Sequence, residues 1–263
     1  MVKELEKAEL ALLATGNPQD QGFANIIAAV RRARGGDIED TTPQTGPKSE
    51  ARDVVVPLVK VIEAYQNQPH TPELITQTHQ AIWQDRGERV GTTYEVTSCP
   101  YTQEKLTDLE ANGKRVGYLP AELATQQTCL VLGKMFPEMR NYIVQKDNRV
   151  TNNEDPFGWF DYEVAIKAPY LDTKERRLLD RIKKDQRTIL SLNQYIAASQ
   201  DSELFTRKYL DEVGTWVRLG SHYGGRIVCA QFGGDGCLQI RWDLEAGHHD
   251  PRLGGRSSGV KKA

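Results

Sequence analysis

Residues 226–243 read RIVCAQFGGDGCLQIRWD and give the clearest structural signal in the chain. Two alternating apolar stretches flank a turn at residues 233–237 that is rich in glycine, which is the pattern of a β-hairpin. Eleven of the 22 glycines of the chain lie between residues 214 and 259. This concentration favours loops and hairpins over helices in the C-terminal region.

The faces of the two strands predict their register. Directly paired residues share one face of a hairpin, so we expect Phe232 to oppose Leu238. The same register places Cys229 opposite Arg241. It therefore argues against a disulfide between Cys229 and Cys237.

Upstream of the hairpin, the pattern predicts a central strand-helix-strand unit. Residues 92–97 alternate as a strand, residues 102–112 carry helical spacing, and residues 115–119 read as a second strand. Residues 160–167 (FDYEVAIK) alternate strictly and predict a further strand.

Helical spacing and capping residues predict the remaining elements. Thr71 as N-cap, Pro72 and Glu73 open a helix that ends near Gly87. The other expected elements are a helix after Pro57, a helix at 121–135, a short strand at 141–145, a long helix at 173–199 and a shorter helix at 202–213. Because helices and strands do not alternate regularly, we expect an α+β fold.

The chain divides by composition into three parts. Residues 1–34 predict two short amphipathic helices, a helical N-terminal appendage. Residues 35–50 are small, polar and rich in helix breakers, which is typical of a linker. Residues 51–263 are expected to form the main α+β domain, with the long helix and the glycine-rich hairpin at its C-terminal end.

Composition limits the class of protein. The chain has 263 residues, 38% of them hydrophobic, a net charge of −2 and a mean hydropathy of −0.58. No apolar run approaches 18 residues, so no membrane contact is expected. The N-terminal stretch carries acidic residues where a signal peptide would be apolar, and the four widely spaced cysteines favour reduced thiols. We therefore expect a cytoplasmic protein.

The leading functional hypothesis rests on charge. Residues 173–187 contain seven basic and three acidic residues, and the C-terminal tail is also basic. Four of the basic residues follow 3-4-3 spacing and so form one helical stripe: Lys174, Arg177, Arg181 and Lys184. The tail adds Arg252, Arg256, Lys261 and Lys262. Together these residues predict a non-catalytic binding protein that engages nucleic acid or an acidic protein partner.

A pair of carboxylates supports an alternative hypothesis. Asp161 and Glu163 lie two residues apart on one face of the strand expected at 160–167. Neighbouring acids can divide acid and base roles or share a divalent metal. This alternative is a metal-dependent hydrolase. The competing interpretation is a solvated strand face.

Cys99 supports a third hypothesis, thiol redox or nucleophilic chemistry. Cys99-Pro100-Tyr101-Thr102 follows an expected strand and precedes an expected helix, where a helix N-terminus can favour thiolate. This string resembles the redox motif of glutaredoxins, with Thr102 in place of the second cysteine. The resemblance covers only these four residues, and a buried structural thiol is the other interpretation.

Other motifs are missing or weak. The chain contains no GxxxxGK[ST] string and no GxGxxG between a strand and a helix. His248, His249 and Asp250 are adjacent, but neighbouring side chains on an extended segment point in opposite directions. We therefore expect no metal site and no bound cofactor. Spacing alone gives no prediction of the oligomeric state.

Overall fold

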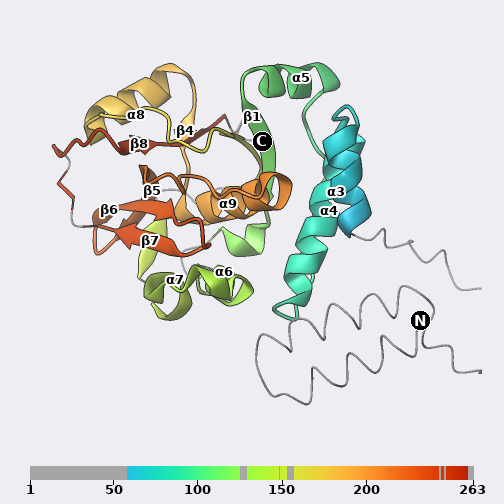
Figure 1. The fold of residues 1–263 in the computed structure, drawn as a ribbon, viewed down its shortest axis with the longest axis horizontal. Coiled ribbons are helices and arrows are strands. Elements are labelled where there is room, and N and C mark those ends of the chain that lie inside the picture. Colours follow the sequence, from blue (N-terminus) through green and yellow to red (C-terminus); the bar gives the residue numbers. More distant parts are fainter. Residues whose placement is uncertain are drawn as a thin grey trace, which may run out of the picture. The chain divides into compact units, whose positions relative to one another are not determined.

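The computed structural model describes residues 58–124, 129–147, 149–152, 157–242, 244–245 and 247–259. These residues form an α+β fold, as the sequence predicts (Figure 1). None of the helices in these ranges has the length and apolar character needed to cross a membrane. The predicted N-terminal helices at 1–34 and the linker at 35–50 lie outside the described residues.

Seven α-helices occur in the described ranges, with short 3-10 turns at Ala121–Leu123 and Pro137–Met139. The helices are α3 (Leu58–Asn67), α4 (Pro72–Glu88), α5 (Gln103–Ala111), α6 (Cys129–Met135), α7 (Tyr142–Lys146), α8 (Glu175–Lys184) and α9 (Leu192–Thr206).

The strands form three sheets. They are β1 (Lys114–Leu119), β2 (Val150–Asn152), β3 (Gly158–Glu163), β4 (Thr188–Ile189), β5 (Trp216–Tyr223), β6 (Arg226–Phe232), β7 (Leu238–Arg241), β8 (Leu253–Gly255) and β9 (Ser257–Ser258). The largest sheet has the order β2-β5-β6-β7, with β8 parallel to β5. β1 pairs with β3, and β4 pairs with β9, both antiparallel.

The C-terminal hairpin has the predicted register. Phe232 pairs with Leu238, and Cys229 pairs with Arg241. Cys229 and Cys237 form no disulfide. The turn between the strands closes through the N–H of Gly233, which donates to the carbonyl of Cys237 at 2.8 Å.

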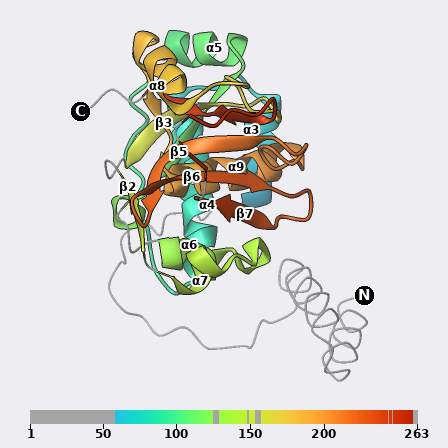
Figure 2. The same cartoon turned by 90° about the vertical axis from the view of Figure 1, so that its left-hand side faces the viewer.

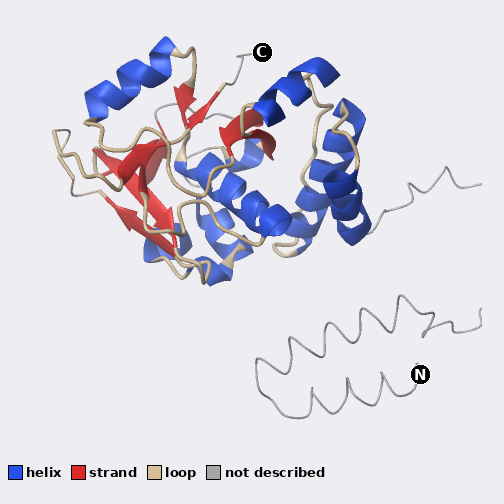
Figure 3. Ribbon diagram, turned by 45° about the horizontal axis from the view of Figure 1, so that its top comes forward, coloured by secondary structure: helices blue, strands red, loops and turns tan. Residues whose placement is uncertain are grey.

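Helix α9 is the centre of the core. Twelve of its 15 residues are buried, so it has no solvent-facing stripe and is enclosed on all sides. It lies between the β5-β6-β7 strands and the pair α3–α4 (Figures 1 and 3). Figure 2 shows the same sheet with α6 and α7 below it. Several buried polar side chains of α9 therefore need partners inside the protein.

The prediction of one continuous helix at 173–199 is wrong. Two helices, α8 and α9, occupy this region, and strand β4 lies between them. Gln186 adopts a left-handed conformation (φ 54°) that ends the first helix. The second helix begins at a capping box, in which the Ser191 hydroxyl accepts from the Gln194 N–H and the Gln194 side chain accepts from the Ser191 N–H.

Some shorter elements also differ from the prediction. Residues 92–97 form no strand, so the central unit consists of α5 and β1, with β3 as the partner of β1. The strand predicted at 141–145 is helix α7, whose first turn Asn141 caps. The strand predicted at 160–167 begins at Gly158 and ends at Glu163.

Candidate functional site

Helix α8 presents the predicted basic stripe to solvent. Leu178 and Ile182 are buried beneath the helix. A side-chain carbon on Gly255 would lie 2.7 Å from Leu178, so strand β8 runs directly below this face. The four stripe residues are exposed: Lys174, Arg177, Arg181 and Lys184. The apolar face thus anchors the helix and orients its charges outward.

Basic side chains outnumber acidic ones on and beside α8, six to two between residues 174 and 184. Arg176 and Lys183 are also exposed, which brings the basic side chains between residues 174 and 184 to six. Across the described residues, none of the six forms an ion pair with a carboxylate. We call these six residues the basic surface of α8. Such a surface attracts anions and loses this attraction as salt increases.

Arg252 lies in a loop that is tied to the beginning of α8. The guanidinium of Arg218 donates to the carbonyl of Thr173 at 2.7 Å and to that of His248 at 2.5 Å, linking the loop to the helix. In the same loop His249 contacts Asp172 at 2.9 Å. The side chain of Arg252 is 72% exposed, and its Nε lies 3.5 Å from Asp250 Oδ1. It therefore extends the basic surface.

Arg256 does not belong to this surface, which corrects the sequence hypothesis for this residue. Its side chain is fully buried and forms an ion pair with Asp211, with Nε to Oδ2 at 2.8 Å. No partner molecule can reach it. Lys261 and Lys262 of the predicted tail lie outside the described residues.

The carboxylates Asp161 and Glu163 are paired with a cation from the protein itself. Arg187 Nη2 donates to Asp161 Oδ1 at 2.5 Å and lies 3.8 Å from Glu163 Oε1. The N–H of Ser257 donates to Glu163 at 3.0 Å. All three charged side chains are at most 14% exposed, so this is not a solvated strand face.

The arrangement around Arg187 leaves little room for a metal ion. Its guanidinium occupies the position between the two carboxylates that a divalent cation would need. A side-chain carbon on Gly259 would lie 2.6 Å from Asp161, so the C-terminal segment covers the pair. Among the described residues, no group of three or more His, Cys, Asp or Glu side chains is placed to hold a metal. No observation here favours the hydrolase hypothesis.

Cys99 is buried rather than presented at a helix N-terminus. Its side chain packs in the core, and its N–H donates to the Thr76 hydroxyl at 2.9 Å. Helix α5 begins after the cap Thr102, three residues further on, and the Thr102 hydroxyl accepts from Lys105. Burial raises the pKa of the Cys99 thiol. A raised pKa disfavours the thiolate that redox or nucleophilic chemistry requires.

This geometry predicts the order of thiol alkylation. Cys237 is partly exposed, whereas Cys99 is buried, and burial raises the pKa of Cys129 to about 12. At pH 8 we expect iodoacetamide to modify Cys237 first and Cys99 more slowly, because burial limits access to the Cys99 thiol and raises its pKa. Peptide mass spectrometry over time measures each rate.

The control for alkylation is Cys237→Ser, which should remove the fast phase and leave the others unchanged. A Cys99 that reacts faster than Cys237, or with a pH midpoint below about 8.5, would restore the thiol hypothesis.

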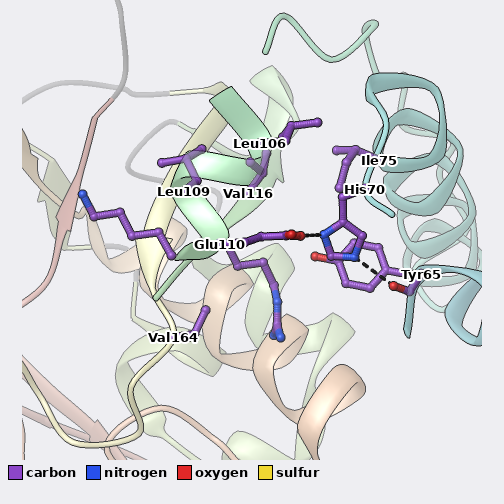
Figure 4. A pocket seen from close by; sticks show the side chains of 10 residues that line it. Tyr65, His70, Ile75, Leu106, Leu109, Glu110, Val116 and Val164 are labelled. Atoms are coloured by element: carbon purple, nitrogen blue, oxygen red, sulfur yellow. Dashed lines mark hydrogen bonds and ion pairs between the residues drawn. The ribbon is translucent and has the colours of Figure 1, made fainter. Parts of the chain in front are cut away.

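A cavity of about 210 Å³ is a second candidate site, and none of its residues is among the sequence candidates. Figure 4 shows it between α3–α4 and α5. Its polar groups come from five side chains, Tyr65, His70, Glu110, Lys114 and Arg115. Glu110 contacts His70 Nδ1, and His70 Nε2 lies 2.8 Å from the Tyr65 carbonyl. These residues come from separate segments with no common spacing, so no sequence motif marks them.

The fold and sites together define an α+β protein with an exposed basic helix and a small, partly open cavity. In comparisons with known proteins, no family model, no curated protein and no solved structure matches the chain. The chemistry of these two sites is therefore the basis for assigning a function.

Proposed function

We propose that this protein binds nucleic acid through the basic surface of α8, with Arg252 at its edge. One observation carries the proposal: six exposed basic side chains lie within 11 residues, and no carboxylate of the described residues pairs with them. A cluster of uncompensated cations on a rigid helix is the electrostatic footprint of a phosphate-binding surface.

The length of the stripe fits a nucleic-acid strand. Lys174 and Lys184 are ten residues apart, which is about 15 Å along a helix. One strand of duplex DNA carries about four phosphates over this axial length. The four stripe residues therefore match the phosphates in number, and contacts of this type carry no sequence information.

The same surface favours a nucleic acid over an acidic protein. Specific protein interfaces centre on buried apolar or aromatic anchors. On α8 the only large apolar side chain that is exposed is Leu179, at 39%. The helix also carries no aromatic side chain on which an unpaired base could stack, so we propose duplex rather than single-stranded nucleic acid.

Reversing the charge of the stripe should abolish this binding. The variant K174E/R177E/R181E/K184E is expected to bind a duplex of about 20 base pairs at least about 100-fold more weakly than the wild type at low salt. Four phosphate contacts predict a similar loss for the wild type when salt rises from about 50 to about 200 mM. Fluorescence anisotropy with a labelled duplex of random sequence measures both effects.

A matched variant controls for net charge. K60E/K134E/K146E/K208E changes the charge by the same amount at four exposed lysines outside α8. It should keep most of the affinity and the salt dependence. Equal losses in both variants, or wild-type binding that persists in high salt, would contradict the proposal. If poly-glutamate competes as well as the duplex, the partner is an acidic protein instead.

We also propose a cytoplasmic location. The supporting observation is that none of the four cysteines forms a disulfide. Three of them are buried, where a disulfide would be protected from reductants. Mass spectrometry of the intact protein, alkylated directly in cell lysate without reductant, should show four reduced thiols. A disulfide-linked pair would contradict a reducing compartment.

A further inference from the structure

The cavity beside α5 combines an apolar wall with two cationic side chains, Arg115 and Lys114. Its volume is about 210 Å³, and its apolar wall includes Ile75, Leu106, Leu109 and Val164 (Figure 4). Arg115 lines the same space. α8 contributes no residue to it, so an inference about this cavity is independent of the proposed nucleic-acid binding.

Arg115 is held in place by aromatic groups. Its guanidinium lies 4.8 Å from the centre of the Phe205 ring, and Phe205 stacks on Tyr65 with ring centres 4.2 Å apart. The guanidinium also interacts with the phenol groups of Tyr65 and Tyr162. These neutral neighbours fix the position of the cation without neutralising its charge.

Arg115 lacks a direct counter-ion in the described part of the chain. Among the described residues no carboxylate forms an ion pair with it. The charge of Asp201 acts on Arg115, but its carboxylate accepts a hydrogen bond from Arg86 at 2.7 Å. A half-buried guanidinium without a carboxylate retains donors that match the two oxygens of a carboxylate ligand.

We propose that this cavity binds a small monocarboxylate with an apolar body. The carboxylate would pair with Arg115, and the hydrocarbon part would occupy the apolar wall. Tyr65 is able to donate a further hydrogen bond, because burial raises the pKa of its phenol and keeps it protonated. This is the common design of small-molecule sites, mainly apolar with a few polar groups that fix the ligand's orientation.

Size and charge define the ligand class further. A cavity of about 150 Å³ lined by apolar side chains holds benzene. A volume of about 210 Å³ therefore suits a single aromatic ring that carries a carboxylate. Arg115 and Lys114 bring two positive charges to the cavity and Glu110 brings one negative charge. The resulting balance of one positive charge matches a monocarboxylate better than a dianion such as phosphate.

The first test compares two probes of the same shape on the full-length wild-type protein. Benzoate carries the charge that Arg115 would recognise, and benzamide is its neutral counterpart. Isothermal titration calorimetry should show benzoate binding at least about tenfold more tightly than benzamide, because a charged hydrogen-bond pair contributes that much or more. Equal affinities for the two probes, or no binding of benzoate, would overturn the proposal.

Two variants assign the binding to this cavity. Arg115→Met should weaken benzoate binding at least about tenfold and leave benzamide unchanged, whereas Arg140→Met, at an exposed arginine, should change neither. Val164→Phe keeps Arg115 but fills the apolar part, and should abolish binding of both probes. It serves as the test should Arg115→Met fail to fold.

Each remaining outcome also decides the question. Benzoate binding that survives both Arg115→Met and Val164→Phe would place the ligand elsewhere and overturn the proposal. If inorganic phosphate competes with benzoate at equal concentration, the ligand of this cavity would be an oxyanion of another class and not a monocarboxylate.

Discussion

Replacing Asp201 with alanine is expected to destabilise the protein by about 3–5 kcal/mol, because Arg86 then remains buried without a counter-charge. Arg86 Nη2 donates to Asp201 Oδ1 at 2.7 Å, and the two side chains are 4% and 0% exposed. The pair joins α4 to the central helix α9. Urea unfolding followed by circular dichroism at 222 nm measures the loss, which is a large part of the stability of a typical domain.

An exposed pair at the C-terminal end of α4 is the control, with Asp85 in the helix and Arg89 at its C-cap. Arg89 and Asp85 form an ion pair at 2.9 Å, but their side chains are 48% and 39% exposed. Asp85→Ala should therefore change the free energy of unfolding by less than about 1 kcal/mol. If the two alanine variants lost equal stability, Arg86 and Asp201 would not be a buried pair.

Removing both charges of the buried pair separates charge from packing. Arg86→Met with Asp201→Leu should be less destabilising than Asp201→Ala alone, because no unpaired charge is left in the core. Some loss should remain, since the Arg86 guanidinium also lies 4.8 Å from the centre of the Trp83 ring and 5.4 Å from that of Phe136. A larger loss in the double variant would contradict this account.

The elements that sequence predicts correctly are those with local chemical signals. Thr71 caps α4 by accepting from the N–H of Leu74 at 3.1 Å, a contact between residues three apart. The Phe232–Leu238 register follows from the alternation of two strands that share a short turn. In both places the partners are close in the chain, so spacing alone identifies them.

The long helix was mispredicted because apolar spacing continues across a break. Ile182 and Ile189 are seven residues apart, as on one face of a helix, yet Ile189 lies in β4 and pairs with Ser257. Tertiary pairing decides the conformation of Ile189, and spacing within the segment does not report it. The signal that marks the second helix is the Ser191-x-x-Gln194 capping box.

The candidate sites also divide into those marked by local sequence spacing and those that depend on contacts between distant segments. The stripe on α8 depends on spacing within one helix and could be read from sequence. No signal in the sequence distinguishes three further arginines, Arg115, Arg187 and Arg256, from exposed ones. The side chains that contact them belong to segments that are distant in the sequence. Arg187 meets Asp161 at a separation of 26 residues, and Arg256 meets Asp211 at 45. Only the fold shows which arginines are exposed and which are already paired.

Replacing Arg256 with methionine is the second change expected to cost about 3–5 kcal/mol of stability. Arg256 donates to both oxygens of Asp211, from Nε at 2.8 Å and from Nη2 at 3.0 Å, and both side chains are 0% exposed. Without Arg256 the Asp211 carboxylate would remain buried and uncompensated. The measurement is again the free energy of unfolding in urea.

The carbonyl contacts of Arg256 add to this effect. Nη1 donates to the Glu163 carbonyl at 2.9 Å and Nη2 to the Ala165 carbonyl at 2.8 Å, so the side chain fixes the segment that follows β3. Because this requires the planar fork of a guanidinium, Arg256→Lys should also be destabilising. Arg256→Met combined with Asp211→Asn should recover part of the loss, since the buried charge is then gone.

Arg252 is the matched control, and the two arginines together distinguish a structural role from a binding role. Arg252→Met should change the free energy of unfolding by less than about 0.5 kcal/mol, because the Arg252 side chain is 72% exposed. The same variant should reduce the slope of the logarithm of duplex affinity against the logarithm of salt concentration by about 1, which corresponds to one lost phosphate contact. Arg256→Met should lower the free energy of unfolding. Under conditions in which this variant remains folded, the salt dependence of its duplex binding should be unchanged. If Arg256→Met left stability unchanged and weakened duplex binding, Arg256 would lie on the surface, as its place in a basic tail first indicates.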